Sequence, residues 1–65
     1  MIEKLMKYKE YLFEKITENA LDGNILMCKY YASCEKECVE LLELFKEMKL
    51  SVNEWHRIRE ITRGL

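Results

Sequence analysis

The stretch MCKYYASCEKECVELLELFKEM, residues 27–48, decides the fold of this 65-residue chain. Apolar residues recur in it with alternating steps of four and three, at Met27, Tyr31, Cys34, Cys38, Leu41, Phe45 and Met48. This heptad pattern is typical of a helix that is buried against other helices along its length. We therefore predict one long helix from Ile25 to about Lys49. The alternative is a break near Ser33, because a serine followed by acidic residues resembles a helix start.

A second amphipathic helix precedes the long one. Residues 2 to 21 place one set of apolar side chains within a single arc of a helical wheel: Ile2, Leu5, Met6, Leu12, Phe13, Ile16 and Ala20. Gly23 can take the left-handed conformation that ends a helix, and Asn24 is a favourable N-cap for the next one. The short connection predicts that the two helices form an antiparallel hairpin, with Leu5 opposite Leu41.

A capping box predicts where a third helix begins. In Ser51-Val52-Asn53-Glu54 the serine hydroxyl can accept from the Glu54 amide, and the Glu54 carboxylate can reach back to the Ser51 amide. Leu50 and Trp55 form the accompanying hydrophobic staple. We predict a helix from Val52 to Thr62 or Arg63, with Gly64 just past its end. The staple predicts that the Trp55 ring lies in the core; an exposed anchor for a partner is the alternative.

These elements predict an all-α fold with a single domain over residues 1–65. It is an antiparallel helical hairpin with one long central helix plus a short C-terminal helix, and so resembles a three-helix bundle. The long helix is apolar over too wide an arc for one neighbour to cover. The surplus predicts a homodimer, with Tyr30, Leu42 or Leu44 near the contact.

Composition limits the function classes. The chain is 49% apolar and 35% charged, contains no proline, and has a net charge of −1. A charge this close to zero gives no bulk field for nucleic acid or an acidic membrane. The N-terminal segment lacks a signal peptide pattern, and no apolar run is long enough to cross a bilayer. We predict a cytoplasmic protein that does not act at a membrane.

The three cysteines are an odd number, which fits a reducing compartment better than a disulfide framework. We interpret Cys28, Cys34 and Cys38 as small packing residues, and predict no metal and no cofactor. Cys28 and Cys38 would lie about 15 Å apart along one helix, too far to share a zinc ion. The alternative is a zinc site made by Cys34 and Cys38 with His56.

Lys9 is the one charged residue near the middle of the apolar arc of the first helix. We expect its aliphatic stem to lie on the surface and its ammonium to pair with Glu35 or Glu37. Two alternatives are that it lowers the pKa of Cys34 or Cys38 to make a redox-sensitive thiol, or that it marks an edge where a partner binds.

No catalytic constellation is recognisable, so we predict that the protein is not an enzyme. No serine or cysteine has a base at a suitable spacing, and no acidic pair lies in a predicted cleft. The last helix is basic through His56, Arg57, Arg59 and Arg63, and could read DNA. Against this, the second half of the long helix is acidic and would lie beside the DNA backbone.

Residues 37–58 resemble the helical hook of the Sin-type anti-repressors of spore-forming bacteria. That hook consists of a Glu-aromatic-Val-x-Leu helix, a Lys-Glu-x-Gly-(Ile/Leu)-Ser turn and a Glu-Glu-Ile-Arg helix. The matching residues are Val39, Leu41, Lys46, Glu47, Leu50, Ser51 and Glu54, whereas Cys38 replaces the aromatic residue, Lys49 the glycine and Trp55 an isoleucine. The resemblance implies a two-helix unit that sequesters a repressor by pairing with its dimerisation hook.

The leading hypothesis is a small regulatory protein of phage or bacterial origin that acts by protein–protein contact, as an inhibitor or anti-repressor of a transcriptional regulator. The residues expected at the contact are Tyr30, Leu42, Leu44, Trp55, His56 and Arg59. A small DNA-binding protein that uses the basic C-terminal helix is the alternative, and a subunit of a larger assembly is the third.

Overall fold

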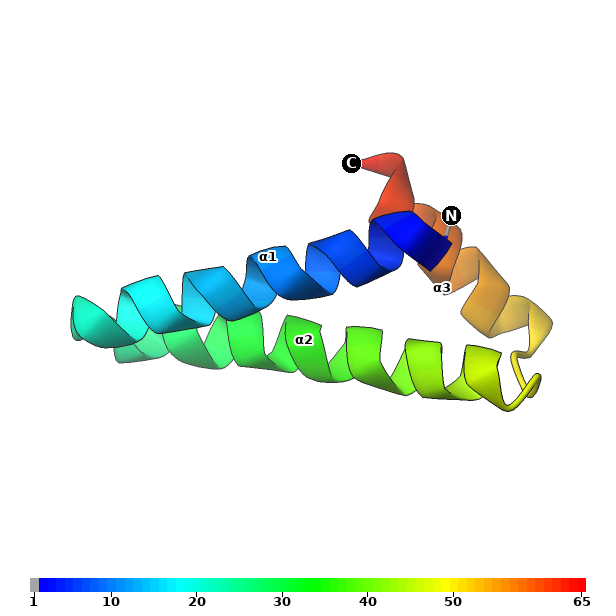
Figure 1. Cartoon of the computed structure of the whole chain (residues 1–65), viewed down its shortest axis with the longest axis horizontal. Coiled ribbons are helices and arrows are strands. Elements are labelled where there is room, and N and C mark those ends of the chain that lie inside the picture. The colour runs from blue at the N-terminus through cyan, green and yellow to red at the C-terminus, as the bar shows by residue number, and fades with distance from the viewer. Residues whose placement is uncertain (1) are drawn as a thin grey trace.

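The computed structural model describes residues 2–65, which form three helices (Figure 1). Helix α1 spans Ile2–Leu21, α2 spans Ile25–Lys46 and α3 spans Val52–Arg63. The all-α fold is confirmed, and α2 runs through Ser33 without a break. Helices α1 and α2 lie antiparallel along the long axis of a body of 38 × 20 × 16 Å.

The turn between α1 and α2 has the geometry that the sequence predicts. Gly23 has a φ of 74°, in the left-handed region. The amide of Asn24 donates to the carbonyl of Asn19 at 2.8 Å, and the amide of Gly23 donates to that of Ala20 at 3.2 Å. This pair of bonds is a Schellman motif, which satisfies carbonyls at the end of α1. The Asn24 side chain then caps α2 by accepting from the Met27 amide at 3.3 Å.

The core is small and draws on all three helices. Its fully or nearly buried apolar side chains are Leu5, Leu12, Cys38, Leu41 and Ile58. Leu5 and Leu12 face Cys38 and Leu41 across the hairpin, as the antiparallel register requires. Helix α3 packs mainly against α1, and its C-terminal half lies beside the start of α1 (Figure 1).

The heptad of α2 is buried only in its middle. Cys38 and Leu41 are buried, whereas Phe45 is 40% and Met48 is 93% exposed. Burial along the whole length of the long helix was therefore a wrong prediction. The reason is that α3 turns away toward α1 and does not lie along the end of α2.

Helix α2 also ends earlier than predicted, at Lys46 instead of about Lys49. Met48 has a φ of 55°, and its amide donates to Phe45 at 3.0 Å while the amide of Lys49 donates to Leu44 at 2.9 Å. This is a second Schellman motif, with a methionine in the left-handed position that glycine usually occupies. In the Sin-type pattern the turn glycine aligns with Lys49, one residue later.

The start of α3 is confirmed at Val52 and its end at Arg63. The Ser51 hydroxyl accepts from the Glu54 amide at 3.2 Å, and the Ser51 amide donates to the Glu54 carboxylate at 2.8 Å. Both halves of the predicted capping box are present. These bonds to Ser51 lower the pKa of Glu54.

Candidate interaction surfaces

The hook surface is an apolar patch where the chain turns from α2 into α3. It consists of Phe45, Met48, Leu50 and Trp55, which line a groove of about 240 Å³. The ring of Trp55 meets that of Phe45 edge to face, with 6.2 Å between the centroids. Trp55 is 40% exposed, so the prediction that it lies in the core was wrong. Leu50 and Trp55 do line one groove, but the direction that α3 takes across the hairpin leaves the ring partly exposed.

Met48 is the most exposed large side chain of this surface. A non-glycine residue in the left-handed region costs about 1 kcal/mol or more. Its apolar side chain reaches solvent, where it contributes little to the core. Met48 therefore combines a strained backbone with an exposed apolar side chain.

The open face is a pair of connected grooves along the α1–α2 hairpin. The residues that line it from α1 are Ile2, Met6, Lys9, Glu10, Phe13 and Glu14, and those from α2 are Glu35, Val39, Leu42, Glu43, Phe45 and Lys46. Met6 is 52% and Phe13 is 62% exposed. Lys9 lines both grooves, each of about 350 Å³, and Phe45 joins the open face to the hook surface. Charged and apolar side chains thus alternate along this face.

Lys9 does not pair as the sequence predicts. Within residues 2–65 it has no salt bridge, because Glu37 binds Arg57 and the Glu35 Oε2 atom is buried without a hydrogen-bond partner. The thiol hypothesis is contradicted for Cys38, since burial raises the pKa of that thiol to about 11. Cys38 is a protonated packing residue at neutral pH.

The cationic groove lies where the start of α1 meets the end of α3. It is lined by Lys4, Arg59, Thr62 and Arg63, with a volume of about 390 Å³. Thr62 is buried and donates its hydroxyl to the Ile58 carbonyl at 2.8 Å. No salt bridge to Lys4, Arg59 or Arg63 occurs in the described part of the chain.

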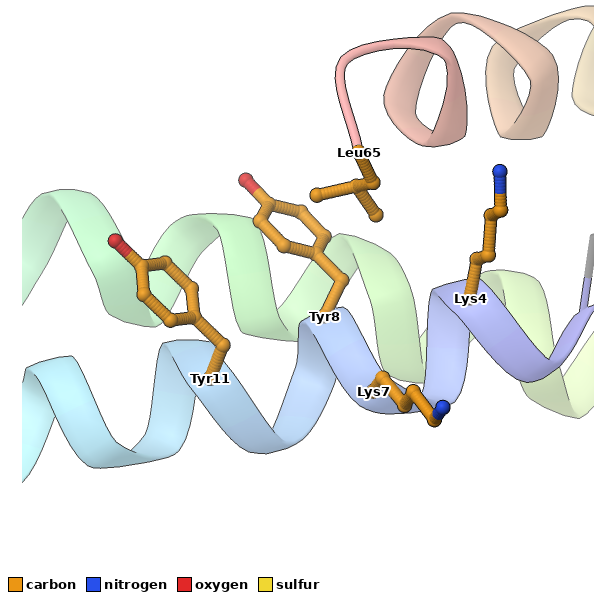
Figure 2. Close-up of a pocket in the computed structure, with 5 residues that line it drawn as sticks. All are labelled: Lys4, Lys7, Tyr8, Tyr11 and Leu65. Carbon is orange, nitrogen blue, oxygen red and sulfur yellow. The ribbon is translucent and has the colours of Figure 1, made fainter.

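A tyrosine pocket adjoins the cationic groove (Figure 2). Tyr8 and Tyr11 project from the same side of α1 with Leu65 over Tyr8, while the Lys4 amino group points toward α3 and Lys7 points away. The two tyrosine rings are stacked at 6.2 Å, and burial raises the pKa of Tyr8. Lys15 lies 5.5 Å from the centre of the Tyr11 ring.

The residues predicted at the contact do not form one site. Trp55 belongs to the hook surface, Leu42 to the open face and Arg59 to the cationic groove. Tyr30 is 59% exposed and lies edge-on to Tyr31, whereas Leu44 is half-buried and His56 is exposed. Sequence reasoning missed Lys4 as part of the cationic groove, because only the fold brings α1 to α3.

In the described part of the chain, the side chains needed for a metal site are not gathered together. Among residues 2–65, no group of three histidine, cysteine or acidic side chains is placed to hold a metal ion. No helix in the same range is long and apolar enough to cross a membrane.

The chain was compared with protein-family models, with curated proteins and with solved structures. None of the three comparisons found a match. The resemblance of residues 37–58 to the Sin-type hook therefore stays a prediction.

Proposed function

We propose that the protein is a small non-enzymatic regulator that acts by protein–protein contact, and that the hook surface is where it binds a transcriptional regulator. The observation that carries this proposal is the exposed cluster of Phe45, Met48 and Trp55 on a turn fixed by two caps. Aromatic and methionine side chains are enriched at the centres of protein interfaces. The resemblance to a Sin-type hook supports a partner that also presents paired helices.

The arrangement fits an inhibitor that binds by helix pairing. Helix α3 is anchored beyond its first turns by the buried Ile58 and Thr62, while the turn end exposes its aromatic ring. A rigid anchor ring loses little conformational entropy on binding, which favours affinity. An anti-repressor would place Trp55 in the helix pair of its target and so displace the second copy of that target.

The test compares the stability and the binding of Trp55→Ala. Because the ring is 40% exposed and also meets Phe45 edge to face, we expect unfolding to become easier by about 2 to 3 kcal/mol. Binding to a purified Sin-type repressor should weaken by about 2 kcal/mol or more, which is roughly thirtyfold. Tyr11→Ala is the matched control, since it removes a ring that is 46% exposed outside the hook surface.

Two outcomes would contradict the proposal. Failure of the wild type to bind the repressor in sedimentation or titration would remove the anti-repressor role. In that case, capture of regulators from a bacterial lysate tests the wider role. Equal retention of every captured protein by wild type and Trp55→Ala would remove the hook as the binding surface.

A second candidate function, nucleic-acid binding, is favoured by the cationic groove. Lys4 adds a third positive charge to Arg59 and Arg63, and Lys7 and two tyrosines lie next to it. Basic side chains beside aromatic rings are typical of surfaces that hold phosphates and stack on bases. Arg57, by contrast, is neutralised by Glu37 and Glu60.

Fluorescence anisotropy with a non-specific duplex and a single strand at low salt tests this second function. Binding should weaken steeply as salt is added and should be lost in Arg59→Glu. Lys29→Glu changes the charge equally outside the groove and should bind almost as the wild type does. No change in anisotropy at micromolar protein would exclude this function.

A further inference from the structure

We propose that the tyrosine pocket and the cationic groove form one binding site for single-stranded nucleic acid, with a phosphate in the groove and an unpaired base in the pocket. The inference rests on the nucleic-acid binding proposed above as the second candidate function. It adds the form of nucleic acid that fits the surface, and it assigns a separate task to each of the two cavities.

The two cavities share one wall. Lys4 lines both of them, and its amino group points toward α3 (Figure 2). Arg59 and Arg63 complete the groove on the α3 side, whereas the pocket continues along α1 to Tyr8 and Tyr11. The groove has a volume of about 390 Å³ and the pocket one of about 330 Å³, which is the size of small-ligand sites. A ligand that joins an anionic group to a flat apolar group can occupy both.

The groove suits the anionic group. Arg59 and Arg63 are one turn apart on α3, so they lie on the same face of the helix. Glu60 lies about 100° further round the helix and binds Arg57 instead. In the described part of the chain, no salt bridge neutralises Lys4, Arg59 or Arg63. A phosphate in the groove therefore meets cations from two helices, which is the sequence-independent part of nucleic-acid binding.

The pocket suits the flat apolar group. The planes of the Tyr8 and Tyr11 rings differ by only 16°, and Tyr11 is 46% exposed. The rest of the wall consists mainly of carbon atoms from Leu65 and the lysine stems. Lys15 lies near the Tyr11 ring but does not line the pocket, so it does not cover the ring on that side. Any nucleobase can stack on such a wall, because every base has a π-face.

A duplex can use only the groove. Its bases are paired and stacked on one another, so only its phosphates are available to a surface of this kind. A base of a single strand can leave the stack and lie against aromatic side chains. The contribution of Tyr8 and Tyr11 to binding is therefore specific for single strands, whereas that of the cations is common to both forms.

Three labelled probes with equal numbers of phosphates separate the two cavities. The first is an oligothymidylate of about ten nucleotides, a length that one small single-strand-binding domain can cover. The second has the same backbone with abasic sugars throughout, and the third is a duplex. In fluorescence anisotropy at low salt, we expect the wild type to bind the oligothymidylate at least about fivefold more tightly than the abasic strand, through one stacked base. This comparison needs no variant.

Tyr11→Ala then isolates the ring. It should weaken binding of the oligothymidylate by about fivefold or more, and it should leave binding of the abasic strand and the duplex within about twofold of the wild type. Because the variant changes no charge, the affinity for the oligothymidylate should keep its dependence on salt. Tyr30→Ala is the matched control, since it removes a ring that is 59% exposed outside the pocket, and it should change none of the three affinities.

The inference and the function on which it rests fail in different ways. If the wild type binds none of the probes at micromolar protein, both are overturned. If all three bind and are lost in Arg59→Glu, but the abasic strand binds as tightly as the oligothymidylate, the groove holds phosphates and the inference alone is overturned. It is also overturned if Tyr11→Ala weakens all three probes equally, or if Tyr30→Ala causes as large a loss as Tyr11→Ala.

Discussion

The guanidinium of Arg57 on α3 binds the carboxylate of Glu37 on α2 through two parallel hydrogen bonds. Nη2 donates to Oε2 at 3.2 Å and Nε donates to Oε1. The carboxylate raises the pKa of Arg57 above its ordinary value. Because α3 packs mainly against α1, this ion pair ties the third helix to the second.

We expect the ion pair to stabilise the fold only slightly. The two side chains are 50% and 36% exposed, so water and salt screen the attraction. A double-mutant cycle with Arg57→Ala and Glu37→Gln should give a coupling energy of about 0.5 to 1 kcal/mol in urea unfolding. The coupling should fall in 1 M salt; a coupling that salt leaves unchanged would contradict this account.

Replacing Met48 by glycine should stabilise the chain. At a φ of 55° glycine avoids the steric cost that methionine bears, and the exposed side chain contributes little packing. We expect a gain of about 0.5 to 1 kcal/mol in the free energy of unfolding. Gly23→Ala is the opposite control: at a φ of 74° it should cost about 1 kcal/mol. A loss of stability in Met48→Gly would show that the side chain packs in solution.

The capping box should make stability depend on pH in the acid range. The folded state lowers the pKa of Glu54 from 4.5, first through the Ser51 amide and then through the hydroxyl. The stabilisation is therefore present above pH 4.5 and is lost as the pH falls through the lower pKa of the folded state. Glu54→Gln should remove this part of the pH dependence of urea unfolding.

Ser51→Ala serves as the comparison for the same box. It should cost about 1 kcal/mol at neutral pH through the lost hydroxyl cap. It should nevertheless keep most of the acid dependence, since the amide of residue 51 still donates to Glu54. Loss of the whole pH effect in Ser51→Ala would mean that the hydroxyl, and not the amide, holds the carboxylate.

Cys38 should make stability fall in the alkaline range. Burial raises the pKa of its thiol from 9.0 to about 11, so the folded state holds the proton more tightly than the unfolded state. Stability is complete below pH 9 and decreases as the pH rises toward 11. Cys38→Ala should flatten this decrease and cost about 1 to 2 kcal/mol at neutral pH as a small cavity. A chelator should change neither curve, and a loss of helicity on adding one would contradict the packing role.

The elements with local signals were predictable, and those set by distant contacts were not. Gly23 with Asn24, and Ser51 with Glu54, fix helix ends through bonds within a few residues, so their patterns were sufficient. The end of α2 was missed because a left-handed Met48 has no sequence signature. The exposure of Trp55 was missed because it depends on the direction that α3 takes across the hairpin.

For the candidate surfaces, too, local patterns were predictable and contacts between distant segments were not. The sequence singled out Lys9 as a misfit and offered a partner-binding edge as one explanation, but its position across from Glu35 needed the register of the hairpin. The cationic groove could not be predicted, since Lys4 and Arg59 approach each other only when the third helix returns to the start of the first.

The packing of α3 against the start of α1 also limits the order in which the chain can complete its fold. The α1–α2 hairpin joins neighbouring segments, so its contacts near Gly23 are close in sequence and can form early. Leu5, however, shares its core cluster with Ile58, which lies in the third helix. During synthesis, the core around Leu5 is therefore complete only after α3 has been made. A shortened copy would therefore expose apolar surface at its beginning, and proteases that recognise unfolded chains would remove it.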